Sequence, residues 1–245
     1  MKKYYYDLHI HSSLSPCGDA DSTPNNIAGM ATISELDIVA LTDHNTCKNC
    51  PAFFSAAEKY GIIPIAGMEL TSAEDIHVVC LFETLEDALK FDDFVYTKRI
   101  LVKNRPEFFG EQHILNENEE IIGTEEYLLS NATTLSLEEV LPLAKEFGGV
   151  AYPAHIDREA NGIVAILGTI PEDTQYKLFE LNDGEKISET SERYGIPKEN
   201  FIISSDAHSL GMMRDKENYF TLPEGDCNSV RRELFKKLKA LAFGG

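Results

Sequence analysis

The sequence predicts an α/β domain in which strands and helices alternate around a largely parallel sheet. Three observations lead to this fold class: short apolar runs, helical segments between them that begin at capping residues, and the lack of any repeat or linker in 245 residues. Strands that alternate with helices of roughly 10–15 residues are typical of βαβ units. A chain of this length fits either an open doubly wound sheet or a closed or distorted βα barrel.

Seven apolar runs are the expected strands. They lie at residues 4–10, 37–42, 62–70, 76–82, 149–155, 178–181 and 201–205. Helices are expected between several of these runs, and their first turns follow the capping residues Thr23, Thr84, Ser136 and either Asp226 or Asn228. Ser136 and Glu139 match a capping box. The apolar stripe of the last helix favours packing on the barrel over dimerisation.

Residues 105–134 interrupt this alternation. The segment is rich in Asn, Glu and Gly and contains little that resembles a strand. It is therefore expected to be an insertion, or a small lobe, within one domain that spans residues 1–245.

The charge balance argues against some partners. The chain has 41 acidic and 22 basic residues, a net charge of −19. Proteins that bind long nucleic acids or anionic membranes through bulk charge usually have the opposite sign. Five cysteines do not form a secreted disulfide framework. Neither a membrane span nor a signal peptide is recognisable, so a cytoplasmic location is expected.

Six of the seven histidines lie at or near the ends of apolar runs. In a parallel βα architecture the carboxyl ends of the strands open onto one face, where functional groups gather. The six are His9, His11, His44, His77, His155 and His208. His9 and His11 alternate along a strand, so both can face one ion while Leu8 and Ile10 pack. Imidazoles bind Zn, Mn or Fe, and the pattern predicts a metal site.

Carboxylates accompany these histidines. Glu69 closes the apolar run 62–70, and Asp206 lies two residues before His208. Carboxylates can bridge two ions, which makes both residues candidate ligands. Asp7 and Asp43 each lie beside a histidine and are expected to fix the orientation of an imidazole instead.

Five segments together resemble the successive motifs of the PHP (polymerase and histidinol phosphatase) family. They are DLHIHSS, ALTDHNT, the glutamate of GMEL, PAHIDR and SSDAHS, and they occur in the family's order from residue 7 to residue 208. The resemblance implies a distorted, TIM-like (β/α)₇ barrel with two or three divalent metals, usually a phosphoesterase. The sequence LSPCGD is closest to a stand-alone bacterial branch of the family.

The resemblance also implies how the ligands divide. His9, His11, Glu69 and Asp206 resemble the first metal's ligands, and Glu69, His77 and His155 the second metal's, with Glu69 as the bridge. His44 and His208 resemble ligands of a third metal. Cys17, Asp19 or Asp21 is expected to complete that third site, and Asp19 is preferred because a carboxylate suits a hard metal.

These residues favour a metal-dependent phosphoesterase that hydrolyses a small phosphomonoester. Divalent ions at a di- or trinuclear site lower the pKa of a shared water and supply hydroxide for attack on phosphorus. Asp206 or His208 is expected to move the proton. Arg158, then Arg214 and Lys48, are the candidates to bind the phosphate, since a guanidinium matches phosphate oxygens. The segment 105–134 is expected to cover the site and set substrate choice.

Three other functions stay open, two of them enzymatic. One is a 5′–3′ exonuclease or nucleotide phosphatase that acts on short oligonucleotides, and C–N bond hydrolysis is a more distant possibility. The third is an inactive metal-binding regulatory module, although every expected ligand position is filled. Gly-x-Ser-x-Gly and Walker motifs are absent from the sequence. Cys47 and Cys50 are interpreted as packing thiols, a redox pair or an auxiliary metal site.

Overall fold

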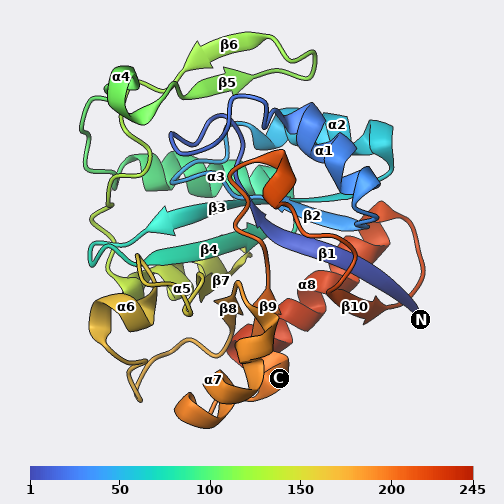
Figure 1. Ribbon diagram of the computed structural model, residues 1–245, viewed down its shortest axis with the longest axis vertical. Helices are drawn as coiled ribbons and strands as arrows, with labels where there is room; N and C mark the ends of the chain where they lie inside the picture. Colours follow the sequence, from blue (N-terminus) through green and yellow to red (C-terminus); the bar gives the residue numbers. More distant parts are fainter. Residues whose placement is uncertain (245) are drawn as a thin grey trace.

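A computed structural model describes residues 1–244 and shows a strongly curled sheet flanked by helices (Figure 1). The main sheet has six strands in the order β10-β1-β2-β3-β4-β7, and two further strands, β8 and β9, pair with each other. The bounds are β1 (Lys2–Ile10), β2 (Ile38–Leu41), β3 (Ile63–Thr71), β4 (His77–Phe82), β7 (Val150–Pro153), β8 (Phe179–Leu181), β9 (Phe201–Ile203) and β10 (Tyr219–Leu222). All seven expected strands are present.

The strands β8 and β9 link the two ends of the curl. The backbone N–H of Ile156, just after β7, donates to the carbonyl of Glu180 in β8 at 2.9 Å. After β9, the backbone N–H of Ala207 donates to the carbonyl of His9 at 3.3 Å, and His11 N–H donates to Ala207 at 2.9 Å. These sparse contacts replace full ladders, so the sheet forms a distorted barrel. The expected fold class is confirmed.

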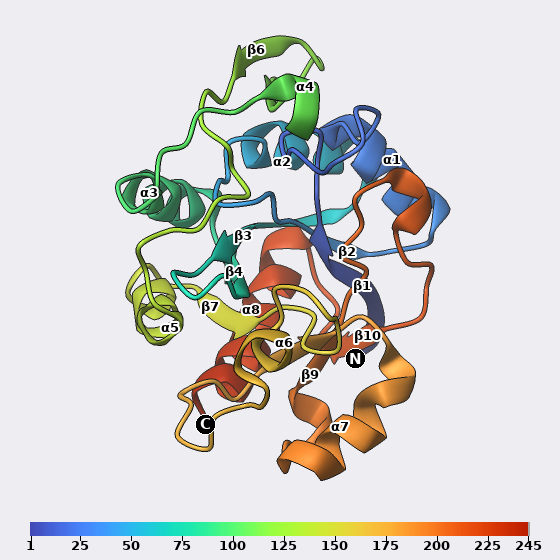
Figure 2. The ribbon, with the colours of Figure 1, turned by 60° about the vertical axis from the view of Figure 1, so that its left-hand side comes forward.

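Two apolar cores lie on opposite faces of the sheet. The helix-layer core joins the sheet to α1 (Pro24–Ile33), α2 (Cys50–Tyr60), α3 (Leu85–Tyr96) and α5 (Leu137–Glu146). The second, the α8 core, contains Val230, Leu234 and Phe235 of α8 (Cys227–Phe243). Figure 2 shows α2 and α8, one helix from each core, on either side of β3. The apolar stripe of the last helix therefore packs on the sheet, as expected.

The expected capping residues begin the helices. Thr84 accepts a hydrogen bond from the backbone N–H of Asp87 at 3.1 Å, and Asp226 accepts one from Ser229 at 2.8 Å. At α5, the Glu139 carboxylate accepts the backbone N–H of Ser136 at 2.8 Å, as a capping box requires. These bonds satisfy amide groups that a helix cannot pair internally.

The strand β4 departs from the parallel arrangement that the sequence suggested. It pairs antiparallel with both β3 and β7, because residues 72–76 are too short to form a crossover helix between β3 and β4. His77 is thus the first residue of its strand, yet it lies at the same edge as the end of β3. The antiparallel edge strand β10 was also not expected from the sequence.

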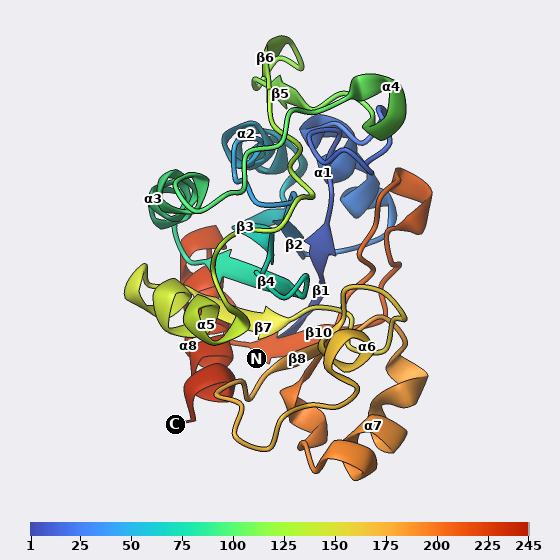
Figure 3. The same ribbon diagram turned by 90° about the vertical axis from the view of Figure 1, so that its left-hand side faces the viewer.

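The segment 105–134 folds beside α2 and lies at one end of the molecule (Figure 3). It contains α4 (Pro106–Phe109) and a hairpin of β5 (His113–Leu115) and β6 (Ile121–Thr124). The Asn49 side chain holds the hairpin, since it donates to the carbonyl of His113 at 3.2 Å and accepts from Leu115 N–H at 2.9 Å. The segment therefore has a short sheet of its own.

The remaining helices are short and lie between β7 and β10. They are α6 (Ile163–Leu167), α7 (Ile187–Tyr194) and the 3₁₀ turns at Gly184–Lys186, Lys198–Asn200 and Leu210–Met212. No helix in the described part of the chain is both long and apolar enough to cross a membrane.

Gly149, directly before β7, offers a test of this packing. An added Cβ would lie 2.6 Å from the backbone oxygen of Leu81 and 2.6 Å from the ring of Phe82. We expect Gly149→Ala to lower the free energy of unfolding by about 1–3 kcal/mol, the usual cost of overpacking. Gly211→Ala is the control, because nothing lies within 4 Å of its added Cβ. Equal melting temperatures for the two variants would contradict the packing described.

Candidate metal centre

The six predicted histidines, Glu69 and Asp206 meet in one cluster at one end of the barrel. They come from the ends of β1, β3 and β7, the start of β4, and the segments that follow β2 and β9. His9 and His11 are fully buried, and Glu69 is 1% exposed. Residues far apart in the sequence are therefore brought together by the closure of the barrel.

A register shift in β1 helps to aim its two histidines. The pairing of β1 with β2 changes between Asp7 and Ile10. As a result Leu8 packs in the α8 core and Ile10 in the helix-layer core, although the two positions alternate with His9 and His11. Both apolar residues pack, as expected, but on opposite sides of the sheet.

Glu69 is the centre of the cluster. Five imidazole nitrogens approach its carboxylate: His77 Nδ1 at 2.8 Å, His155 Nε2 at 3.0 Å, His44 Nδ1 at 3.1 Å, His11 Nε2 at 3.2 Å and His9 Nε2 at 3.4 Å. Burial alone raises the pKa of the Glu69 carboxyl, but the surrounding imidazoles, His77 first, hold that pKa well below its usual range. Glu69 is therefore an ionised carboxylate in a buried site.

Asp206 forms the second acidic side of the cluster. Its carboxylate lies 3.0 Å from His11 Nε2 and 3.4 Å from His9 Nε2. Its backbone adopts a φ of 52°, and His155 a φ of 28°, both in the left-handed region. Such backbone strain costs on the order of 1–3 kcal/mol and persists only where the surrounding structure enforces it. Both strained residues face the cluster.

Three groups of side chains have the geometry to hold an ion. They are His9, His11, Glu69 and Asp206; His44, Glu69 and His77; and His11, His44 and His208. The first matches the set expected for one metal. In the second, His44 joins Glu69 and His77, while His155 Nε2 lies 3.3 Å from His77 Nδ1. The division of ligands between the second and third metals stays a prediction.

The donor set fits divalent metal ions. His44 Nδ1 and Glu69 Oε2 are buried and have no well-aligned hydrogen-bond partner. Buried polar atoms are normally satisfied, and those left over need an explanation such as an ion. Imidazole and carboxylate together suit Zn, Mn or Fe. A metal ion bound by these lone pairs would supply the partner that the two buried atoms lack.

The two aspartates that were expected to orient imidazoles act differently. Asp43 accepts hydrogen bonds from the Ser15 hydroxyl at 2.7 Å, and Ser15 Oγ lies 3.0 Å from His11 Nδ1. Asp43 therefore reaches an imidazole through a serine. Asp7 accepts the backbone N–H groups of Ser205 at 3.0 Å and Arg214 at 3.2 Å, so it holds backbone rather than a ring.

Glu180 contacts the cluster residues and was missed in the sequence. Its Oε1 lies 2.8 Å from His9 Nδ1 and accepts the backbone N–H of His155 at 3.1 Å. The pattern that indicates it is a charged residue inside the apolar run 178–181. Burial of a carboxylate is rare unless it is paired.

The candidates for completing a third site lie in the loop after β1. The Asp19 carboxylate accepts the backbone N–H of Asp21 at 2.9 Å, and Asp19 N–H donates to the carbonyl of His208 at 2.7 Å. Cys17, Asp19 and Asp21 are all exposed, and none belongs to the ion-holding groups found among residues 1–244. The loop after β1 therefore lies next to His208, and a hydrogen bond between backbone groups joins the two.

The three predicted phosphate-binding cations are placed differently. Arg158 Nη1 lies 2.5 Å from Asp206 Oδ2, and the Arg158 side chain is 38% exposed. Lys48 is paired with Glu125. Arg214 donates to the carbonyl of Asn182 and lies 3.2 Å from Glu217. Arg158 is thus the cation that contacts the cluster.

The cysteines Cys47 and Cys50 are both buried in the helix-layer core. Cys47 Sγ donates to the carbonyl of Gly67 at 3.2 Å. Burial, with the neighbouring Cys50 thiol, raises the pKa of Cys47 well above its ordinary value. A thiolate is the reactive form of cysteine, so this environment favours the packing interpretation.

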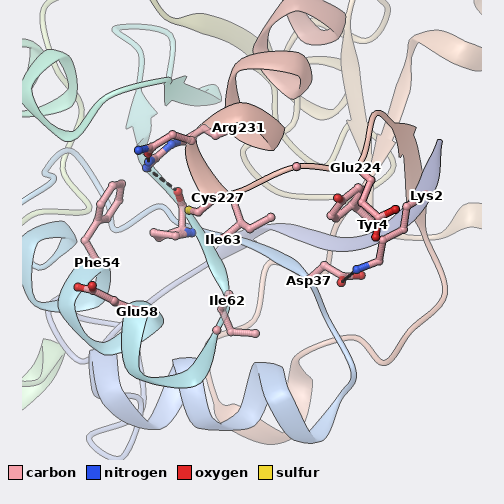
Figure 4. Close-up of a pocket in the computed structure, with 14 residues that line it drawn as sticks. Lys2, Tyr4, Asp37, Phe54, Glu58, Ile62, Ile63, Glu224, Cys227 and Arg231 are labelled. Carbon is pink, nitrogen blue, oxygen red and sulfur yellow. Dashed lines mark hydrogen bonds and ion pairs between the residues drawn. The ribbon is translucent and has the colours of Figure 1, made fainter.

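A separate cavity of about 550 Å³ lies far from the cluster along the strands (Figure 4). It is at the amino-terminal ends of β1 and β3, whereas the cluster is at their carboxyl ends. Two of its charged groups have partners: Lys2 pairs with Asp37 at 3.3 Å, and Arg231 donates to the carbonyl of Pro64 at 3.3 Å. It shares no lining residue with the cluster.

A curled α/β barrel with a buried His/Glu/Asp cluster at one end defines a class of metal-dependent hydrolases. The sequence model for the PHP domain matches residues 7–152, and the chain therefore belongs to the PHP domain family. This confirms the resemblance seen in the motifs. Members of this family are metal-dependent hydrolases of phosphoester bonds.

Similar proteins differ in size from this chain. A PolC-type DNA polymerase III from Thermotoga petrophila is 28% identical over 161 residues, which cover 56% of the chain and 12% of the polymerase. The lesion-specific endonuclease Q of Pyrococcus furiosus superposes over 100% of the chain and 57% of its own, at a TM-score of 0.62 and 20% identity. A proposed metal-dependent phosphoesterase from Bifidobacterium adolescentis superposes over 94% of this chain and 96% of its own chain, with a TM-score of 0.55 and 17% sequence identity. These structures show the shared fold.

Proton release should accompany metal binding. Burial lowers the pKa of His11, but the adjacent carboxylates of Asp206 and Glu69 outweigh this and raise it to about 9. Despite burial, Glu180, Glu69 and Asp206 also raise the pKa of His9 well above its usual value. Both imidazoles are therefore charged at neutral pH, and an ion must displace their protons. We expect affinity for Mn²⁺ to rise from about pH 6 to about pH 9.

Isothermal titration calorimetry in Tris and in HEPES measures this release, because the two buffers have different ionisation enthalpies. His113→Gln is the control, since His113 lies in β5 outside the cluster, and it should release as many protons as the unaltered protein. Equal heats in both buffers, with an affinity independent of pH, would show that the histidines are neutral before the metal binds.

Proposed function

We propose that this protein is a phosphoesterase that hydrolyses a small phosphomonoester at a di- or trinuclear metal centre. The observation that supports this most directly is the position of Arg158. Its guanidinium contacts the buried carboxylate of Asp206 and is itself partly exposed. A phosphate bound at the mouth of the cluster would meet both a metal-binding carboxylate set and a guanidinium fork, which matches phosphate oxygens.

In this proposal His9, His11, Glu69 and Asp206 hold one ion, and the remaining histidines of the cluster hold the others. Bound divalent ions would lower the pKa of a water and neutralise charge on the phosphate. Glu69 would supply oxygens to more than one ion, because it belongs to two of the groups of side chains that could hold one. Asp206 keeps Arg158 directed at the mouth of the cluster.

His208 is suited to exchange a proton with the substrate or solvent. Burial and the nearby His11 lower the pKa of His208 to about 4, so the imidazole is neutral at pH 7. Its Nδ1 lies 2.8 Å from the carbonyl of Asp206, which accepts the Nδ1 proton. The lone pair is therefore on Nε2, where it either binds a metal ion or takes up a proton.

A cavity next to Arg158 offers room for the rest of the substrate. It has a volume of about 470 Å³ and lies between the segment after β7 and α7. Arg158, Lys186, Arg193 and Tyr194 are among its lining residues. We propose that it holds the alcohol portion of the phosphomonoester. Its volume is in the ordinary range for a small-molecule site.

The segment 105–134 borders the other side of the cluster and is proposed to set substrate choice. The Asn45 side chain, one residue after His44, donates to the carbonyls of Leu129 at 2.6 Å and Asn131 at 2.9 Å. Gly110 lies against Pro16, in the loop that follows His11, where an added Cβ would be 3.0 Å from the Pro16 oxygen. The segment thus contacts two of the loops that supply ligands.

A nuclease acting on short oligonucleotides is the second candidate. Endonuclease Q, whose complex with a 27-mer duplex carrying an abasic lesion is known, superposes on 94% of the chain at a TM-score of 0.59 and 20% identity. This chain spans 56% of that protein. The net charge of −19 supports a small substrate over a long polymer, but it is compatible with short oligonucleotides.

Arg158→Ala tests the proposed phosphate contact. We expect kcat/KM for the best phosphomonoester to fall by about 10- to 100-fold, which corresponds to losing one charged hydrogen bond. Arg158→Lys should recover part of the loss, because a lysine keeps the charge but not the fork. Arg232→Ala, on the exposed face of α8, is the matched control and should change nothing.

The measurement is phosphate release from a panel of phosphomonoesters, nucleotides and short oligonucleotides with Mn²⁺, Zn²⁺ or Fe²⁺. A His155→Ala variant reports any contaminating activity. Preference for oligonucleotides would favour the nuclease. No turnover with any substrate, in protein shown to contain its metals, would favour an inactive metal-binding module and contradict the proposal.

A further inference from the structure

We propose that Glu180 is a positioning residue that sets the metal-binding form of His9 and the backbone position of His155. The inference rests on the proposed metal centre and adds to it a residue that is not itself a ligand. Glu180 lies in the middle of β8 and is fully buried. Its neighbours Phe179 and Leu181 pack in the helix-layer core, so strand alternation directs Glu180 into the barrel.

Glu180 fixes which nitrogen of His9 bears a proton. Glu180 Oε1 already accepts the backbone N–H of His155, so this oxygen is an acceptor, and its 2.8 Å contact with His9 Nδ1 requires a proton on Nδ1. In neutral imidazole the lone pair is then on Nε2. That atom lies 3.4 Å from both Glu69 and Asp206, on the side where an ion would bind. Glu180 is therefore behind the ring and outside the cluster.

The same oxygen holds a second ligand through its backbone. Glu180 Oε1 accepts the N–H of His155 at 3.1 Å, and the Glu180 carbonyl accepts the N–H of Ile156 at 2.9 Å. These two bonds maintain His155 at its strained φ of 28°. The geometry of this turn directs His155 Nε2 towards Glu69, 3.0 Å away.

One carboxylate thus joins two strands that the sheet does not pair. β1 pairs with β10 and β2, and β7 pairs with β4, so no ladder fixes His9 relative to His155. Hydrogen bonds behind metal ligands orient the ring and raise its basicity, and their loss typically weakens metal binding by about 10- to 100-fold. Glu180 supplies this contact in the part of the barrel where β8 and β9 form no ladder with β7 or β1.

Two substitutions of similar volume separate the contributions of Glu180. Glu180→Gln keeps an oxygen that can accept both hydrogen bonds but removes the charge. Glu180→Met fills the same space without an acceptor. We expect Glu180→Met to weaken Mn²⁺ binding by about 10- to 100-fold, and Glu180→Gln to bind more tightly than Glu180→Met.

Asp92→Asn is the matched control. Asp92 is a buried carboxylate that accepts a backbone N–H, that of Cys47 at 3.1 Å, but it does not contact the cluster. Affinity is measured by calorimetry on metal-free protein, with circular dichroism to confirm folding. Binding as tight in Glu180→Met as in the unaltered protein, or an equal loss in Asp92→Asn, would overturn the proposal.

Nuclear magnetic resonance of the ¹⁵N-labelled, unaltered protein gives an independent test that needs no variant. In the Zn²⁺-loaded protein, His9 should bear its proton on Nδ1, and a proton on Nε2 would refute the assignment. Neither readout measures turnover. Protein that binds metal as described but hydrolyses no phosphoester would contradict the proposed function and leave the role of Glu180 intact.

Discussion

The ionised carboxylate of Glu69 is the group on which the arrangement of this barrel depends. Removing such a charge from water costs several kcal/mol unless partners compensate for it. Here the compensation comes from five imidazoles that belong to four separate segments of the chain. The segments must converge at one end of the barrel for the carboxylate to be buried at all. The same convergence leaves nitrogen and oxygen lone pairs directed at shared positions.

Several departures of the sheet from a regular barrel occur where the residues of the cluster lie. The register of β1 shifts between Asp7 and Ile10, just where its histidines follow. β4 runs antiparallel and so begins, rather than ends, at the cluster with His77. β7 and β9 are followed by residues with positive φ, His155 and Asp206. These local departures direct donors from different strands towards the carboxylate of Glu69.

Much of the cluster was predictable because ligand chemistry is written in single residues at strand ends. A histidine that follows an apolar run can be recognised without knowing which residues surround it in the fold. Capping residues such as Thr84 can also be recognised, because they act within one helical turn. The direction of β4 was less accessible, since it depends on the length of a connection rather than on the composition of the strand. Lys48 and Arg214 resembled phosphate ligands in sequence, but their partners, Glu125 and Asn182, are distant in the chain. Glu180 could not be recognised from the sequence for the same reason, because its partners His9 and His155 are distant in the chain.

The acidity of the protein is compatible with an anionic substrate because fields act locally. Charges on the outer surface are screened over roughly 10 Å at ordinary salt concentrations, whereas groups in a buried cluster are screened much less. At the cluster, the acidic groups Glu69 and Asp206 face imidazoles and Arg158. Added divalent ions would make this region positive within a chain of net charge −19. Such a field would attract a compact phosphate to the mouth of the barrel, while the net negative charge of the chain would oppose the approach of a long polyanion.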